Sequence, residues 1–79
     1  MYYLYLILYE DGSIYTGVTN DVNRRFQEHR EGKGGQYTKK HKPLRLLGCE
    51  RFYTKQDALK RERQIKGWRK DKKMAIIKK

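Results

Sequence analysis

The distribution of apolar residues over positions 1–18 predicts a β-hairpin. Every residue from Tyr2 to Tyr9 is aliphatic or aromatic, and residues 13–18 are again rich in β-branched and aromatic side chains. The turn signal Glu-Asp-Gly separates the two segments. Because side chains alternate along a strand, the tyrosines at odd positions share one face of the first strand, and its leucines share the other.

The length of the hairpin loop decides whether Tyr5 and Tyr15 lie on the same face. A two-residue Asp-Gly loop of type I′ places them on opposite faces. A three-residue loop over 10–12, with Gly12 in the left-handed conformation, places them diagonally on one face and sets Gly17 opposite Tyr5. We favour the three-residue loop, because it separates the leucines completely from the tyrosines. The alternative explanation of the tyrosines is only that they suit β-strands.

The rest of the chain predicts a helix, a strand and two more helices, over about 21–30, 44–52, 54–66 and 74–77. Asn20 or Asp21 caps the first of these helices. Thr54 and Asp57 resemble a capping box at the start of the next helix, which Gly67 ends. The order ββαβαα predicts an α+β fold, a three-stranded antiparallel sheet with helices packed on it. We find no internal repeat or linker, so the 79 residues are expected to form a single domain.

Composition and charge favour a nucleic-acid partner. The chain has 20 Lys and Arg against 9 Asp and Glu, which gives a net charge of +11. No Lys or Arg precedes Arg24, so the chain from there onward has a balance of +14. Nucleic acid is the simplest partner for such a surface, and an anionic membrane is the lesser choice. The N-terminal apolar run is too short to span a bilayer and lacks the flanks of a signal peptide. The single cysteine, Cys49, excludes a disulfide framework, so we expect a cytoplasmic protein.

Two basic residues of the predicted helix 21–30 project side by side. Arg25 and His29 are four residues apart, and they flank the apolar stripe of Val22 and Phe26. The pair is a candidate for binding an anion. The alternative is an ordinary basic face turned to solvent. His29 has no partner at metal-ligand spacing, so we do not expect a zinc site.

Glu62 is the most informative single residue. It lies within the apolar stripe that Ala58, Leu59 and Ile65 form along their predicted helix. An acid in such a position is costly unless it is paired or coordinates a metal. The alternative is that its carboxylate reaches solvent and pairs with Lys66, four residues further on.

Two tripeptides carry a resemblance to a known family. Tyr3-Leu4-Tyr5 is followed, ten residues after its last tyrosine, by Tyr15-Thr16-Gly17. Together they resemble the paired motif that names the GIY-YIG nuclease superfamily. The segment 20–29 is similar to the family's arginine-bearing helix, and 58–66 has its Ala-Leu-x-x-Glu pattern. The whole series most resembles small stand-alone members related to the nuclease domain of the excision-repair protein UvrC.

The resemblance implies a phosphodiesterase that depends on Mg²⁺ (or Mn²⁺) and cleaves DNA with low intrinsic sequence specificity, as in DNA repair. It implies that Tyr5, Tyr15, Arg25 and His29 are catalytic, and that Glu62 is the metal ligand. Elementary chemistry suits these roles. One carboxylate with phosphate oxygens and waters can hold Mg²⁺, and an arginine can stabilise the pentavalent transition state. A tyrosine hydroxyl can orient or deprotonate a water molecule.

Further contacts with nucleic acid are expected from the motif glycine, from a loop rich in Gly and Lys, and from the basic face of the helix that holds the acid: Gly17, Lys33, Tyr37, Lys39, Lys40, Arg61, Arg63 and Lys66. Tyr37 can stack on an unpaired base. Val18 stands where several nucleases of the family carry Lys. The alternative function is therefore a nucleic-acid-binding module of the same fold with little or no turnover. DNA is a likelier ligand than RNA on this reading, and a partner protein can supply specificity in either case.

Overall fold

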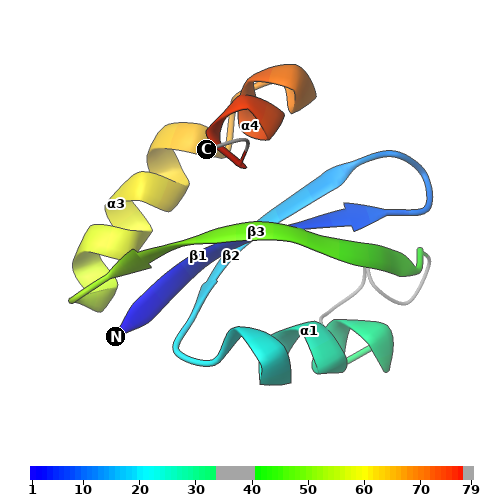
Figure 1. Cartoon of the computed structure of the whole chain (residues 1–79), viewed down its shortest axis with the longest axis horizontal. Coiled ribbons are helices and arrows are strands. Elements are labelled where there is room, and N and C mark those ends of the chain that lie inside the picture. Colours follow the sequence, from blue (N-terminus) through cyan, green and yellow to red (C-terminus); the bar gives the residue numbers. More distant parts are fainter. Residues whose placement is uncertain (34–40, 78–79) are drawn as a thin grey trace.

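The computed structural model describes residues 1–33 and 41–77 and has the predicted element order (Figure 1). Its elements are β1 (Tyr2–Tyr9), β2 (Ile14–Thr19), α1 (Val22–Arg30), β3 (Pro43–Phe52), α3 (Lys55–Ile65) and α4 (Lys70–Ile77). The strands form one antiparallel sheet in the order β2-β1-β3. The predicted α+β fold is therefore confirmed. No helix within the described residues is both long and apolar enough to cross a membrane.

The hairpin has the three-residue loop. In the register of β1 and β2, Tyr5 lies opposite Gly17, which puts Tyr15 on the same face as Tyr5. Gly12 has a φ of 85°, and its N–H donates to the Tyr9 carbonyl at 2.9 Å. This is the left-handed conformation that the three-residue loop requires at its last position.

Gly12→Ala is expected to lower the free energy of unfolding by about 1 kcal/mol, because a Cβ is disfavoured at this φ. Gly67→Ala is the matched control, since Gly67 has no positive φ and nothing lies within 4 Å of its Cβ position. The control is expected to be neutral or slightly stabilising. Urea denaturation of both variants measures the difference. Equal stabilities of the two variants would contradict the loop assignment.

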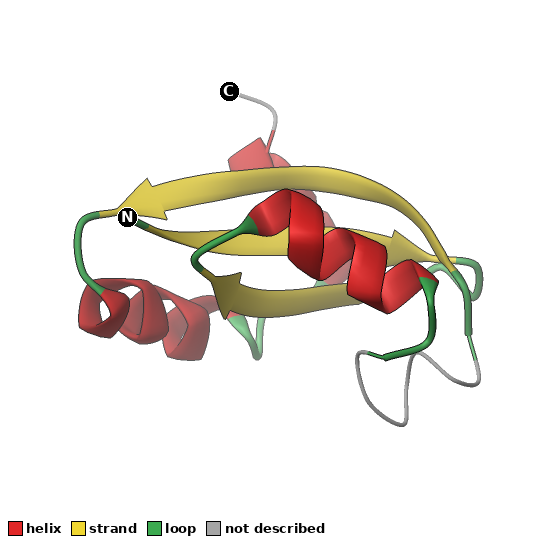
Figure 2. Cartoon of the chain, turned by 90° about the horizontal axis from the view of Figure 1, so that it is seen from below, coloured by secondary structure: helices red, strands yellow, loops and turns green. Residues whose placement is uncertain are grey.

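Both faces of the sheet are covered (Figure 2). On the tyrosine face, the buried residues are Tyr5, Ile7 and Tyr9, and the partly buried residues packed on them are Tyr15, Val22, Phe26 and Leu46. Helix α1 covers this face, and α3 and α4 lie on the other side of the sheet. Leu4 and Leu6 are buried on that other face, where Ala58 and Ile65 of α3 are also fully buried. The tyrosine face is thus part of the core, and the candidate active site forms at its edge.

The helix caps follow the sequence with one exception. Asp21 caps α1, and Thr54 caps α3, each by accepting a hydrogen bond from a backbone N–H three residues on. The prediction that Gly67 follows the end of α3 is confirmed in position, since the helix runs to Ile65 with Lys66 as its C-cap, but Gly67 has no positive φ and forms no left-handed cap. Instead the chain leaves the helix through a turn in which Trp68 N–H donates to the Ile65 carbonyl at 2.9 Å. Such a turn needs no left-handed residue.

Candidate active site

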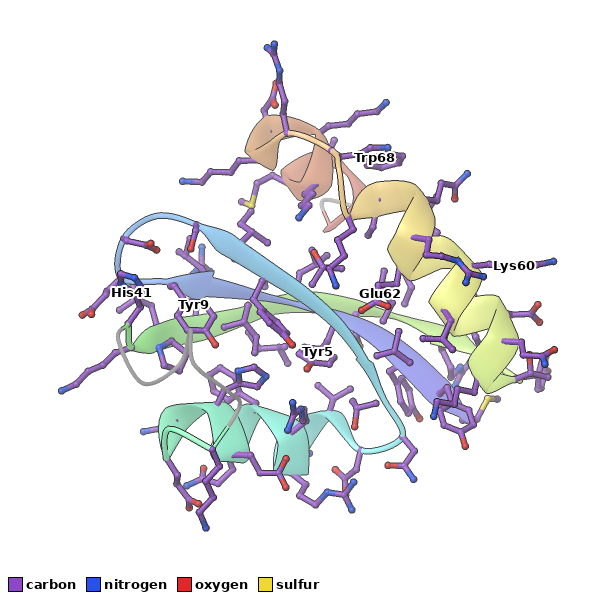
Figure 3. The ribbon with its side chains drawn as sticks, turned by 180° about the vertical axis from the view of Figure 1, so that it is seen from behind. Tyr5, Tyr9, His41, Lys60, Glu62 and Trp68 are labelled. Atoms are coloured by element: carbon purple, nitrogen blue, oxygen red, sulfur yellow. The ribbon has the colours of Figure 1, made fainter. Side chains whose placement is uncertain are left out.

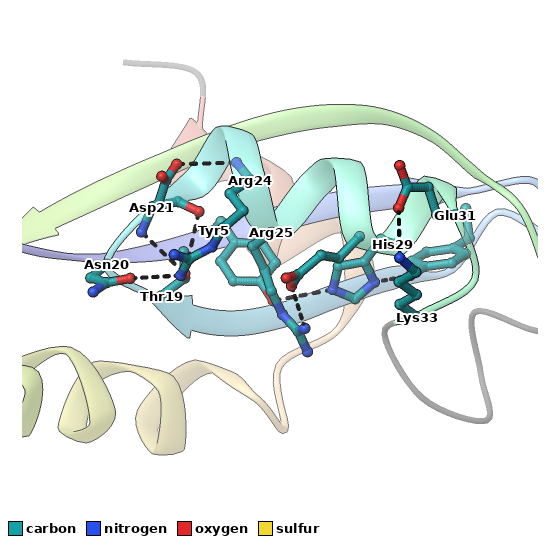
Figure 4. Close-up of polar contacts among 11 residues, drawn as sticks. Tyr5, Thr19, Asn20, Asp21, Arg24, Arg25, His29, Glu31 and Lys33 are labelled. Atoms are coloured by element: carbon teal, nitrogen blue, oxygen red, sulfur yellow. Dashed lines mark hydrogen bonds and ion pairs between the residues drawn. The ribbon is translucent and has the colours of Figure 1, made fainter.

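Tyr5, Arg25 and His29 meet between β1 and α1 (Figure 4). The Tyr5 hydroxyl lies 3.2 Å from His29 Nε2 and accepts a hydrogen bond from Arg25 Nε at 3.4 Å. Arg25 and His29 are one turn apart on α1, and the apolar Val22 and Phe26 hold this helix on the tyrosine face. The helix therefore directs both polar side chains at one phenol, as the spacing suggested.

His29 is enclosed by phenols. It is 0% exposed, and its Nδ1 lies 2.6 Å from the Tyr9 hydroxyl while its Nε2 faces Tyr5. Burial lowers the pKa of His29, and the positive charge of Arg25 lowers it further, so the imidazole is neutral near pH 7. The alternative of a basic face turned to solvent is therefore wrong for His29. With no exposed nitrogen, its imidazole acts on the site through the tyrosines around it.

The two motif tyrosines differ in accessibility. Burial raises the pKa of the Tyr5 phenol to about 12, and the neighbouring Tyr15 adds to this rise, while the hydrogen bond from Arg25 opposes it. Tyr5 therefore keeps its proton near neutral pH. Tyr15 is only half-buried, with its ring centroid 6.1 Å from that of Tyr5 and 4.7 Å from that of His29. Tyr15 is consequently the tyrosine that a water molecule approaches more easily.

Gly17 makes room for the Tyr5 hydroxyl. A Cβ at this position would lie 2.5 Å from Tyr5 Oη and 3.0 Å from Tyr15 Cε1. The first of these distances is shorter than real Cβ contacts allow. Gly17 is itself buried, so its contribution to the site is to let both rings pack against the backbone of β2.

Arg25 is held at the edge of the site by two partners. Its Nε donates to Tyr5, and its Nη1 donates to Glu28 Oε1 at 2.9 Å. The hydrogen bonds to Glu28 and to Tyr5 raise the pKa of Arg25, which stays charged. Its side chain is 31% exposed, and its Nη2 has no acceptor among the described residues. The guanidinium is thus oriented by the protein and still offers donors to an incoming anion.

Glu62 lies on the other side of β2 from the phenols. Helix α3 packs on β1 and β2, and Figure 3 shows Glu62 and Tyr5 on opposite sides of the β2 ribbon. Its side chain is 18% exposed, and its one ion pair among the described residues is to Lys66 Nζ at 3.9 Å. No hydrogen bond within the described part of the chain joins it to Tyr5 or Arg25. The expected ion pair with Lys66 is present, but its separation of 3.9 Å is long.

The donor chemistry at Glu62 fits a divalent cation of the Mg²⁺ type. Hard cations take carboxylate oxygens, and Mg²⁺ is commonly held by one or two carboxylates together with phosphate oxygens and waters. Within 1–33 and 41–77, no three or more His, Cys, Asp or Glu side chains are grouped so that they could hold a metal ion. Glu62 thus offers one carboxylate, and a cation bound there would take its further ligands from substrate and water.

The residues expected to contact nucleic acid are not equally available. Those that are exposed are Lys33, Arg63 and Lys66. Arg61 is engaged, because its Nε donates to Glu50 at 3.0 Å and its guanidinium lies 5.3 Å from the centre of the Trp68 ring. Three further candidates lie outside the described residues: Tyr37, Lys39 and Lys40.

Two residues of the site were not among the candidates from the sequence. Tyr9 contacts His29, and Glu28 orients Arg25. The spacing of Arg25 and Glu28 on the predicted helix was a usable signal for that pair. Tyr9 shares the strand face of Tyr5, but nothing in the sequence shows that the imidazole lies between these two tyrosines.

Comparison with known proteins identifies the family of this chain. The sequence model of the GIY-YIG catalytic domain matches residues 1–75. A UPF0213 protein of Cupriavidus necator is 57% identical over 65 residues, covering 82% of this chain and 71% of the relative. A UPF0213 protein of Staphylococcus aureus is 43% identical over 77 residues, covering 98% and 94%. The solution NMR structure of a UPF0213 protein from Bacillus halodurans is 38% identical, with a TM-score of 0.59 and coverage of 98% of this chain and 83% of that one. The chain therefore belongs to the GIY-YIG family.

Proposed function

We propose that the protein is a divalent-metal-dependent endonuclease that hydrolyses phosphodiester bonds in DNA with low intrinsic sequence specificity. Membership of the GIY-YIG family supports a nuclease-type function on nucleic acid. For this chain, the proposal rests on the convergence of Arg25 and His29 on the Tyr5 hydroxyl, with Tyr15 beside them. A tyrosine face that only packs has no need of an oriented, partly buried guanidinium, which costs free energy to desolvate.

Arg25 is the residue suited to the scissile phosphate. Its planar guanidinium is charged, is held by Tyr5 and Glu28, and keeps Nη2 free of acceptors among the described residues. A donor oriented before the reaction stabilises the charge that develops on the phosphoryl oxygens without further reorganisation. Its attachment to α1 also keeps it close to the hydroxyl of Tyr5.

The two tyrosines would share the handling of the attacking water. Tyr15 is the more accessible and orients the water or accepts its proton, while Tyr5 keeps its own proton and serves as a hydrogen-bonding group. The water oxygen forms a bond to phosphorus, and the bond from phosphorus to the leaving oxygen breaks. One proton of the water passes through the Tyr15 hydroxyl to solvent, and the leaving oxygen takes up a proton from solvent. Glu62 would hold the divalent ion, which when bound neutralises charge on the phosphate and the leaving oxygen.

The proposal is tested by incubating the purified protein with labelled duplex, flap, fork and single-stranded DNA, with Mg²⁺ and with EDTA. Cleavage is expected with Mg²⁺ alone. Arg25→Lys is expected to slow cleavage about 100-fold, because a lysine keeps the charge but loses the oriented donors. Arg24→Lys is the matched control, since Arg24 is exposed and, within the described part of the chain, its side chain donates to Asn20 alone. Equal rates for the two variants would contradict the role of Arg25.

Binding to duplex DNA is expected to weaken steeply with salt. The reason is the balance of +14 carried by the chain from Arg24 onward. Each neutralised phosphate should contribute about 0.9 to the slope of log affinity against log salt. Arg63→Ala, at an exposed position of α3, should lower that slope by about one, and Arg61→Ala by less, because Arg61 is already paired with Glu50. Fluorescence anisotropy over a salt series measures the slopes, and a flat affinity would overturn the prediction.

Binding without any cleavage under these conditions would identify the alternative function, a nucleic-acid-binding module of the same fold. Val18, in place of the lysine that several nucleases of the family carry, is the feature that favours it. RNA of the same sequences, included as a further substrate, separates the two nucleic acids.

A further inference from the structure

Tyr9 is joined to the candidate active site through His29. It is the last residue of β1 and is 0% exposed, and its hydroxyl lies 2.6 Å from His29 Nδ1. The other ring nitrogen, Nε2, faces the Tyr5 hydroxyl at 3.2 Å. Arg25 Nε then donates to that same hydroxyl. An unbroken series of polar contacts therefore runs from a buried phenol to the guanidinium at the edge of the site.

We propose that Tyr9 is a positioning residue: through His29 it determines which hydrogen bond the Tyr5 hydroxyl offers to the reacting groups. The inference rests on the proposed nuclease function for its consequence in catalysis, but the coupling of Tyr9 to His29 stands on geometry alone. His29 in turn is a positioning residue, because its enclosed ring cannot touch a substrate.

A neutral imidazole has one N–H, so one ring nitrogen donates and the other accepts. If the Tyr9 hydroxyl donates to Nδ1, the proton of His29 is on Nε2 and is donated to Tyr5 Oη. Tyr5 then accepts from His29 and Arg25, and its own O–H is free to point at a water or a phosphate oxygen. In the opposite arrangement, Nδ1–H donates to Tyr9, and Tyr5 spends its proton on Nε2.

The two distances favour the first arrangement. Hydrogen bonds donated by a hydroxyl are shorter than those donated by a ring N–H. The contact of 2.6 Å at Tyr9 fits a hydroxyl donor, and the contact of 3.2 Å at Tyr5 fits an N–H donor. Among residues 1–33 and 41–77, the charged and titratable groups around the ring are Arg25, Glu28 and the phenols, including Tyr15. Tyr9 thus sets the Nε2–H form of His29 and leaves the Tyr5 O–H free to donate a hydrogen bond to the reacting groups.

Nitrogen-15 NMR of the full chain, without metal or DNA, tests the coupling. In the wild-type protein, His29 is expected to show a protonated Nε2 and an unprotonated Nδ1. Tyr9→Phe removes the donor, so the resonances are expected to shift toward the other tautomer or a mixture. Tyr3→Phe is the matched control, because Tyr3 lies on the same strand and face, and it should leave the His29 resonances unchanged. An unchanged tautomer in Tyr9→Phe would overturn the inference.

Cleavage kinetics test the consequence for catalysis. Tyr9→Phe is expected to lower kcat about tenfold or more. KM should change little, because the protein groups that bind the DNA backbone are not altered. If Tyr9 has only a structural role, Tyr9→Phe will lower the melting temperature but leave the His29 tautomer and kcat unchanged. That result would overturn the inference. If the wild-type protein cleaves nothing, the proposed function fails, and the NMR result still decides the coupling.

If Tyr9→Phe does not fold, 3-fluorotyrosine at position 9 replaces it. Fluorination makes the phenol a stronger donor and keeps the hydroxyl in place. It is expected to shift the His29 nitrogen resonances, whereas the same substitution at Tyr3 should not. Equal responses at the two positions would overturn the inference.

Discussion

Glu62→Ala is expected to abolish cleavage and to leave the melting temperature unchanged or higher. The side chain is 18% exposed and lies in the apolar stripe of α3, and its one ion pair among the described residues is the contact of 3.9 Å to Lys66. An ionised group in such surroundings costs free energy that a bound cation offsets. Under the proposed function, removal of the carboxylate takes away the metal ligand but no strong contact. DNA binding is expected to persist, because no basic residue is changed.

Glu50→Ala is the matched control. Glu50 is also a partly exposed glutamate paired with a base, at 3.0 Å to Arg61. Its loss is expected to lower stability by about 1 kcal/mol and to spare cleavage. Cleavage rates, thermal melts and anisotropy measured on both variants separate the roles. If Glu62→Ala cleaves at the wild-type rate and melts lower, Glu62 is a structural partner of Lys66, and the nuclease assignment fails in its present form.

Gly17→Ala is expected to destabilise the protein by about 3 kcal/mol and to reduce cleavage strongly. The added Cβ would lie 2.5 Å from Tyr5 Oη and 2.7 Å from Tyr5 Cζ. Tyr5 is 1% exposed, so its ring has no free space to move into. Overpacking of this kind usually costs about 1–3 kcal/mol, and the short distances place this site at the upper end. Urea denaturation measures the loss of stability.

A double-mutant cycle with Tyr5→Phe identifies the cause of this loss. Tyr5→Phe alone removes the hydrogen bonds to His29 and Arg25 and is expected to be destabilising. In the presence of Gly17→Ala, the same change removes the atom nearest to the new methyl group, so the double variant should be more stable than the sum of the single effects predicts. Strict additivity would show that the clash with the hydroxyl is not the cause.

The secondary structure of this protein was predictable from short segments of the sequence. The signals involved each depend on a few neighbouring positions. They are the apolar run of 2–9, the loop that ends in Gly12, and the capping residues Asp21 and Thr54. Alternation along the strands was enough to choose the hairpin register, because a slip by one residue exchanges the two faces. The same rule put Tyr5 and Tyr15 together. The end of α3 was predicted to within one residue, but no left-handed cap forms there, since a glycine at position 67 permits such a cap and does not require it.

By itself, the sequence thus determined the element order, the hairpin register and the shared face of Tyr5 and Tyr15, because these depend on residues close along the chain. Only the tertiary structure decided how closely α1 packs on the tyrosine face. That packing buries His29 between Tyr5 and Tyr9, pairs Arg25 with the Tyr5 hydroxyl, and leaves Glu62 across β2 from them. Helical spacing shows which residues point the same way, but it does not show how close an opposing strand lies. The tautomer of His29 and the pKa of the Tyr5 phenol depend on the distance between α1 and β1, and the proposed catalytic roles depend on both.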